Sequence, residues 1–184
     1  MRTGKYVIML LATIAATSIA LHAGDARRRR RSEARTAAAE ARAKGTAPSV
    51  SFLGDGADTL RLGNADRDVW VILHVTATGC RPCDRLVARL VTSIPSARTR
   101  AVEFWVVGPL SVHGSDALAE VGLRVRTVHP LDPASFRDQF GLGRIPYLAL
   151  VDPAGVVRAV QVGYWDGVHL DRFDPKRLSG LSSP

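Results

Sequence analysis

Cysteine is scarce in this chain of 184 residues, with two copies, at positions 80 and 83. A disulfide-rich scaffold is therefore excluded, because domains of that class depend on several bridges. A closed zinc site of four thiolates within one chain is excluded for the same reason. Hydrophobic residues make up 46% of the chain and charged residues 23%, which excludes both an extended disordered polypeptide and a multi-spanning membrane protein. The length suits one globular domain with an appendage, and no internal repeat is visible.

Acidic residues are few in the N-terminal quarter of the chain. Residues 1–45 carry ten Lys/Arg and three Asp/Glu, a net +7, whereas residues 46–184 carry fifteen and fourteen, a net +1. The total of +8 and the pI near 10.5 therefore describe the appendage and not the domain. No aromatic residues interleave with the arginines of the appendage to stack on bases, so the charge predicts no nucleic-acid partner.

Residues 6–23 form an uncharged run of 18 residues after a short N-terminal flank, residues 1–5. As a helix this run covers about 27 Å at 1.5 Å per residue, enough to cross a bilayer hydrocarbon core. We interpret it as an uncleaved transmembrane anchor. A secretory signal is the first alternative, although the arginines directly beyond the run are unusual for a cleaved signal, and a buried soluble helix is the second.

Residues 24–45 form a basic linker between the apolar run and the domain. The basic patch consists of Arg27, Arg28, Arg29, Arg30 and Arg31. It could face the lipid and hold anionic headgroups. Residues 32–44 then continue in an Ala/Glu/Arg composition with strong helix propensity, ending at Gly45. Beyond orienting the chain in the membrane, we favour a stop-transfer flank and solvated spacer without a specific ligand.

From residue 46 onward, short apolar runs alternate with turn residues, which predicts an α/β domain over residues 46–184. The expected elements are strands 49–53 and 59–62 as a hairpin, strand 69–76, helix 84–94, strand 101–107, a short helix 115–121, a short edge strand or extended segment 123–128, helix 132–140, strands 147–151 and 156–162 as a second hairpin, and a final helix within 166–181. The strand–helix–strand unit spanning residues 69–107 should have parallel strands and a right-handed connection.

The sequence Cys80-Arg81-Pro82-Cys83 lies where a buried strand meets the start of a helix. A dithiol redox centre needs one exposed, ionised thiol and a second thiol close enough to attack a mixed disulfide. The N–H groups and the positive end of the helix would stabilise a thiolate on Cys80, and Arg81 adds positive charge beside it. Pro82 is tolerated because N–H groups in the first helical turn lack intrahelical partners.

Other interpretations of the cysteine pair remain open at this point. The pair could be a structural disulfide or two unrelated thiols, whereas haem attachment is excluded because residue 84 is Asp and not His. A metal site would need a histidine from elsewhere in the sequence. The candidates are His74, His113, His129 and His169.

A second signal is the pair Ile145-Pro146, which directly precedes an expected strand. Proline is awkward there unless it fills an edge or a special turn. A cis bond facing the dithiol would allow the backbone of Ile145 to pair with a bound peptide, whereas an ordinary trans proline at a strand start is the alternative.

The order of hairpin, VWVILHVTATGCRPC, amphipathic helix, AVEFWVV, helix and RIPYLALVDPAGVV resembles the thioredoxin-like superfamily. Within it, the chain is similar to the membrane-anchored thiol-disulfide oxidoreductases of the TlpA and MauD type, over about residues 49–163. The resemblance implies a central mixed sheet flanked by helices. It also implies Cys80 as the attacking thiol, Cys83 as the resolving thiol, the two as a redox-active disulfide, and Pro146 as the cis-proline.

His74 and the residues before Cys80 bear on how far the resemblance extends. His74 lies six residues before Cys80, where many relatives carry a buried acidic or polar residue beneath the dithiol, so it is a candidate proton relay. Gly79 replaces the aromatic residue that commonly precedes the first cysteine, which affects partner choice more than chemistry. The peroxidase members of the superfamily fit less well, since their usual Pro and Thr are Leu73 and Ala77 here.

The resemblance implies an enzyme without a cofactor that exchanges disulfides with a protein partner and is regenerated by an upstream electron donor. The proline before the second cysteine resembles reducing relatives, so reductase is favoured over oxidase. A copper-binding assembly factor, with two thiolates and a histidine such as His129 or His169, is the alternative function. A scaffold with a vestigial dithiol is a third.

Two arguments disagree on the side of the membrane on which the domain lies. The arginines after the apolar run place the domain in the cytoplasm by the positive-inside rule. The anchored members of the family act outside the cytoplasmic membrane, where partners with stable disulfides exist. We expect the domain on the extracytoplasmic side.

Overall fold

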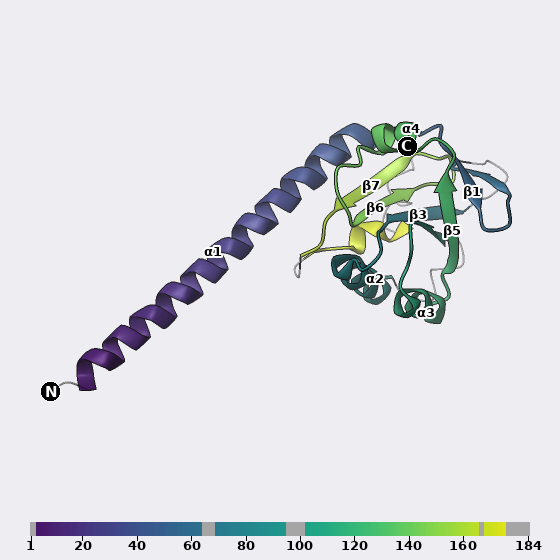
Figure 1. The fold of residues 1–184 in the computed structure, drawn as a ribbon. Coiled ribbons are helices and arrows are strands. Elements are labelled where there is room, and N and C mark those ends of the chain that lie inside the picture. Colours follow the sequence, from purple (N-terminus) through teal and green to yellow (C-terminus); the bar gives the residue numbers. More distant parts are fainter. Residues whose placement is uncertain (1–2, 64–68, 95–101, 166–167, 176–184) are drawn as a thin grey trace.

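The computed structural model describes residues 3–63, 69–94, 102–165 and 168–175, with the backbone alone for residues 3–12 and 112–113 (Figure 1). In these residues one sheet of seven strands has the order β2-β1-β5-β4-β3-β6-β7. The strands are β1 (Ser51–Gly54), β2 (Thr59–Arg61), β3 (Trp70–Val75), β4 (Val102–Val107), β5 (Arg124–Pro130), β6 (Tyr147–Val151) and β7 (Val157–Val162). The helices are α1 (Thr3–Ala43), α2 (Arg81–Ser93), α3 (Val112–Glu120) and α4 (Pro133–Phe140), followed by a 3-10 turn, η2 (Asp171–Phe173).

The sheet is mixed, as the sequence predicts. The strands β3 and β4, joined through α2, are parallel, and β4 and β5 are parallel as well. The two expected hairpins are present as the antiparallel pairs β1–β2 and β6–β7. The centre of the sheet is thus formed by strands whose C-terminal ends meet at one edge, where the loop that leads into α2 begins.

Two details of the predicted elements are wrong. The strand expected at an edge, β5, lies inside the sheet, because β1 pairs with its other side and extends the sheet by a hairpin. The helix after the cysteines begins at Arg81 and not at Asp84, so Cys80 is its N-cap and Cys83 lies within its first turn. The final helix expected within residues 166–181 falls mostly outside the described residues.

Both faces of the sheet are buried. On one face, Ile72, Phe104 and Leu148 pack with the apolar stripes of α2 and α3. On the other face, Leu73 and Tyr147 pack in a cluster that includes residues of α4 and of the end of α1. Coverage on both sides explains why β3 and β6 read as nearly continuous apolar runs instead of alternating ones.

The helix α1 is one continuous helix of 41 residues that spans both the predicted anchor and the predicted linker. Figure 1 shows its N-terminal part extending far from the domain and its last turns lying beside β7 and α4. The packed part includes Thr36, Ala39 and Ala43, which are buried, so the contacts of the domain begin before the boundary expected at residue 46.

The expected anchor, residues 6–23, falls in part on residues 6–12, whose side chains lie outside the described ones. In the portion of the chain whose side chains are described, no helix is both long and apolar enough to cross a membrane.

Candidate active site

Cys80 and Cys83 are joined by a disulfide at the N-terminal end of α2, with their Cα atoms 5.2 Å apart. Cys80 is the N-cap residue, and its Sγ accepts a hydrogen bond from the backbone N–H of Cys83 at 3.3 Å. The carbonyl of Cys80 accepts from the backbone N–H groups of Cys83 and Asp84. The first-turn N–H groups are therefore aimed at Cys80, as expected for a helix start that stabilises negative charge on sulfur.

The two sulfur positions differ in exposure. Cys83 is 1% exposed, whereas Cys80 is only partly buried, and Arg81 and Pro82 between them are exposed. The chain turns sharply into α2 at Gly79, whose φ of +69° lies in the left-handed region that favours glycine. The local sequence thus brings one cysteine to the surface and keeps the other against the core.

His74 lies fully buried in β3, on the same face as Ile72, and its ring centroid is 5.8 Å from that of Phe104. Its Nδ1 lies 3.3 Å from the carbonyl oxygen of Tyr147, and its Nε2 is buried without a hydrogen-bond partner. A carbonyl oxygen only accepts, so Nδ1 carries the proton in the neutral ring and Nε2 keeps an open lone pair.

Burial lowers the pKa of His74 from 6.5 to about 4, while the Tyr147 carbonyl and the charge of Asp84 act weakly in the opposite direction. The ring is therefore neutral at pH 7. Within the described contacts, His74 makes no hydrogen bond to either cysteine, although the influence of Asp84 shows that the ring lies within electrostatic range of the start of α2.

The Ile145–Pro146 peptide bond is cis. Ile145 is 37% exposed, which is unusual for a large apolar side chain, while Pro146 is buried. The following residue, Tyr147, is buried and donates its hydroxyl hydrogen to the carbonyl of Phe140 at 2.7 Å; burial raises its pKa. Pro146 and Pro82 line one cleft, so the cis-proline loop lies beside the loop between the cysteines.

The arginine run lies on an exposed part of α1, and part of it lines a cleft beside the loop between the cysteines. Arg28, Arg31 and Arg35 line the cleft that contains Pro82 and Pro146. The sequence does not bring this helix and the cysteine loop together, because the two are separated by about 50 residues without a shared motif. The role of Arg27 to Arg31 toward lipid stays a prediction.

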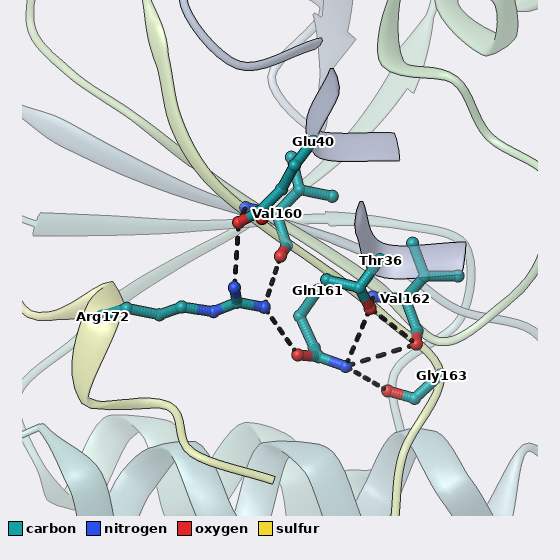
Figure 2. A network of polar contacts seen from close by, with 7 residues as sticks. All are labelled: Thr36, Glu40, Val160, Gln161, Val162, Gly163 and Arg172. Atoms are coloured by element: carbon teal, nitrogen blue, oxygen red, sulfur yellow. Dashed lines mark hydrogen bonds and ion pairs between the residues drawn. The ribbon is translucent and has the colours of Figure 1, made fainter. Parts of the chain in front are cut away.

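The helix α1 is held against β7 by a polar network, drawn in Figure 2, that the sequence did not indicate. The hydroxyl oxygen of Thr36 accepts from the backbone N–H of Val162 at 3.1 Å, and the hydroxyl of Ser32 donates to the Val162 carbonyl at 2.7 Å. These contacts satisfy the open edge of β7, the last strand of the sheet. We call this contact the α1–β7 seam.

Arg172 joins the seam from the C-terminal side. Its guanidinium donates to the Glu40 carboxylate at 2.9 Å, to the carbonyl of Val160 at 2.6 Å and to the side-chain oxygen of Gln161 at 2.7 Å. Burial lowers its pKa, and the charges of Glu40 and Asp171 raise it in turn. One sequence feature could have indicated this contact. The spacing of Ser32, Thr36, Ala39, Glu40 and Ala43 places them on one face of α1.

The histidines considered for a metal site are not gathered around the cysteines. His129 is exposed on β5, where it pairs with Leu53, and His169 is exposed near η2. The side chain of His113 lies outside the described ones. Among the side chains that are described, no three His, Cys, Asp or Glu residues form a group that could hold a metal ion.

The sequence matches no family model and no curated protein. The structure is similar to many solved structures, among them the thioredoxin domain of a thiol-disulfide oxidoreductase from Bacteroides vulgatus, at 14% identity over 76% of this chain and 99% of that one, with a TM-score of 0.50. Another is copper-bound ScoI from Arabidopsis thaliana, at 11% identity over 74% of this chain and 98% of that one, with a TM-score of 0.51. These likenesses show that the fold is thioredoxin-like.

Proposed function

We propose that this protein is a membrane-tethered thiol-disulfide oxidoreductase of the TlpA and MauD type, acting as a reductase of protein disulfides. The observation that carries the proposal is the unequal exposure of the cysteine pair at the start of α2, with Cys80 accessible and Cys83 at 1% exposure. Exchange through a mixed disulfide needs that asymmetry, because one thiol must meet the partner and the other must attack from within. The family of the structural neighbours supports the same chemistry.

In the first step, the Cys80 thiolate of the reduced protein attacks one sulfur of the substrate disulfide. A bond forms between Cys80 Sγ and that sulfur, the substrate S–S bond breaks, and the other substrate sulfur leaves as a thiolate that takes a proton from water. The N–H of Cys83, which donates to Cys80 Sγ, stabilises the attacking thiolate. Arg81, exposed in the first turn of α2, adds positive charge.

In the second step, Cys83 loses its proton and attacks Cys80 Sγ. The Cys80–Cys83 disulfide forms, the bond to the substrate breaks, and the second substrate sulfur leaves as a thiolate. Two electrons have then passed to the substrate. We propose that the Cys83 proton passes through the open Nε2 of His74. Burial lowers the pKa of the ring to about 4, so the neutral ring can accept the proton but does not retain it at pH 7, and the proton goes on to solvent. A dithiol donor of the membrane or of another protein restores the dithiol.

The test of this assignment is trapping of mixed disulfides. Cys83→Ser should accumulate covalent complexes with a disulfide-containing protein, since the resolving thiol is gone, and Cys80→Ser should accumulate none. Reduction of insulin by the wild-type chain provides the activity readout, with Cys83→Ser limited to a single attack. Equal trapping by both variants would contradict the division of labour, and no reduction by the wild type would contradict the function.

The role of His74 has its own kinetic test. His74→Ala should slow resolution by Cys83 more than attack by Cys80, when the two phases are followed by rapid mixing. If both phases slow equally, His74 is a core polar residue and not a proton relay. The exposed His129 provides the matched control, because His129→Ala should alter neither phase.

We place the tether at residues 6–23 and the domain on the extracytoplasmic side. The 18-residue apolar run supports the tether, and the use of a dithiol reductase where partners hold stable disulfides supports the side. The measurement is labelling of the cysteines in intact cells by a membrane-impermeant maleimide after mild reduction. Labelling that requires cell lysis would place the domain inside, as the positive-inside rule favours.

A further inference from the structure

Two clefts flank the loop between the cysteines, and both are walled by α1. The first, about 300 Å³, contains Arg28, Arg31, Arg35 and Arg144, with Ile145 and Pro146 among its apolar residues. We call it the cis-proline cleft. The second cleft, about 540 Å³, is lined by Arg28, Arg29, Arg81, Arg85, Asp25, Pro82, Tyr164 and Trp165. We call it the α2 cleft.

The two clefts adjoin each other, because they share the lining residues Arg28, Pro82 and Tyr164. Each has four arginines, and Asp25 is the one carboxylate among the described residues that line either cleft. Asp25 lies 3.6 Å from Arg28, with both side chains largely exposed, so it offsets little of the positive charge. A cleft lined by one sign of charge concentrates the field on whatever binds beside the disulfide.

Three of the five arginines of the run, Arg28, Arg29 and Arg31, line the clefts. Arg28, Arg31 and Arg35 are spaced by three and four residues, so they lie on one side of α1. Arg27 and Arg30, from the same run, line neither cleft. The seam fixes this orientation, because Ser32 and Thr36 of the same helix bond to Val162 at the end of β7.

We propose that these clefts bind an acidic segment of the protein whose disulfide is exchanged, so that the substrate class is a disulfide flanked by Asp and Glu residues. Guanidinium groups pair with carboxylates through paired N–H donors, and the exposed side chain of Ile145 supplies apolar contact between them. This inference rests on the proposed function, since it names the partner of the same site.

The position of the clefts favours a polypeptide over a lipid headgroup. Pro82 lies between the two cysteines, and it lines both clefts, so a chain that follows them passes the loop between the cysteines. A headgroup held by Arg28, Arg31 and Arg35 would occupy the place where a substrate must lie. The arginines that line neither cleft, Arg27 and Arg30, remain available to lipid.

The experiment measures binding first, without chemistry. The full oxidised chain in a neutral detergent is titrated into fluorescently labelled peptides of equal length in which Ser replaces both cysteines, flanked by Glu, Ser or Lys. The Glu peptide should bind about tenfold more tightly than the Ser peptide at low ionic strength, and the Lys peptide more weakly than either. The preference should shrink as salt is added.

A matched pair of double variants tests the geometry. The double variant Arg31→Gln/Arg35→Gln should lower the affinity for the Glu peptide about fivefold. The double variant Arg27→Gln/Arg30→Gln removes the same charge and should lower that affinity by less than about twofold. Equal affinity for the three peptides, or equal loss in both variants, would overturn the proposal. So would a cleft variant that keeps peptide affinity but loses retention on phosphatidylcholine vesicles containing phosphatidylserine, because the site would then be a lipid site.

Exchange kinetics separate this inference from the proposed function. The reduced chain is mixed with the same three peptides carrying an internal disulfide. Faster exchange with the Glu peptide than with the Ser peptide supports the proposal, and equal rates for all three overturn it while leaving the reductase in place. No exchange with any peptide or with insulin contradicts the reductase, and the binding measurement then still decides whether the clefts take an acidic chain.

Discussion

The disulfide site and the α1–β7 seam differ in how many of their polar groups have hydrogen-bond partners. At the seam, the two terminal nitrogens of Arg172 and the hydroxyl of Thr36 have partners, while Nε of Arg172 is buried without one. At the disulfide site, Nε2 of His74 is buried without a partner, and Cys80 remains open to the surface. Hydrogen bonds that are formed stabilise a fold, whereas a buried polar atom without a partner costs stability. The seam has several such bonds for its one unpaired nitrogen, whereas the ring of His74 has one polar contact, to the Tyr147 carbonyl.

The two regions also have different tasks: one holds the groups proposed to react, and the other holds α1 in place beside them. The groups proposed to react lie mostly within one short motif and depend on the start of α2. The groups of the seam come from residues about 130 positions apart, and they set where the arginines of α1 lie relative to that motif. Changes at the two regions should therefore affect different measurements.

The largest effect is expected at the disulfide site. Cys80→Ser should reduce disulfide exchange to the background rate, because no other thiol is accessible. Its free energy of unfolding should stay within about 1 kcal/mol of that of the reduced wild type, since serine and cysteine are similar in size and residue 80 is partly exposed. Urea unfolding with an insulin reduction assay measures both. Large destabilisation would show that Cys80 also supports the fold.

The next effect is the pH dependence that His74 confers on stability. Its folded-state pKa of about 4 lies below the unfolded value of 6.5, so protonation favours the unfolded chain. Stability from this group is complete above pH 6.5 and should fall by about 3 kcal/mol as the pH drops to 4. NMR titration of the ring and urea unfolding across this range provide the measurement. The control His129→Gln changes an exposed histidine and should leave the slope of unfolding free energy against pH unchanged. A His74 ring that titrates near 6.5 would contradict the argument from burial.

A smaller loss of stability is expected from breaking the seam. Arg172→Met leaves the Glu40 carboxylate and the Val160 carbonyl without their partner, which should lower the free energy of unfolding by about 2 kcal/mol. Exchange with the neutral peptide, per folded molecule, should not change. Arg124 is 70% exposed, and its ion pair with Glu103 spans 3.6 Å, so Arg124→Met should cost less than about 0.5 kcal/mol. Similar losses of unfolding free energy in the two variants would show that the contacts of Arg172 stabilise the fold no more than an exposed ion pair does.

The smallest effect is expected at Gly163, where α1 approaches the end of β7. Its φ is +76°, and an added Cβ would lie 2.8 Å from the hydroxyl oxygen of Ser32. Gly163→Ala should therefore cost about 1 kcal/mol, most of it from the backbone conformation. Gly143→Ala is the control, since nothing lies within 4 Å of its added Cβ. Thermal unfolding measures both, and no difference between them would show that the left-handed conformation of Gly163 costs an alanine nothing.

Local sequence patterns predicted most of the elements. The run that forms β3 is apolar because both faces of the sheet are covered, and Asp132 caps α4 by accepting from the N–H groups of Ala134 and Ser135. The motif of Cys80 to Cys83 marked the region in which α2 begins, although the helix starts at Arg81 and not at the expected Asp84. The position of β5 was wrong because edge status depends on what pairs with the other side of a strand, which no local pattern records.

The sequence by itself determined the dithiol, its place before a helix, and the concentration of positive charge in the N-terminal quarter. Only the tertiary structure decided that Arg28, Arg31 and Arg35 line a cleft beside the loop between the cysteines and that Arg27 and Arg30 do not. Periodicity tells which residues of a helix share a face. The direction of that face is set by contacts with distant residues, here Ser32 and Thr36 with Val162, because the open edge of β7 must be satisfied by whatever packs beside it.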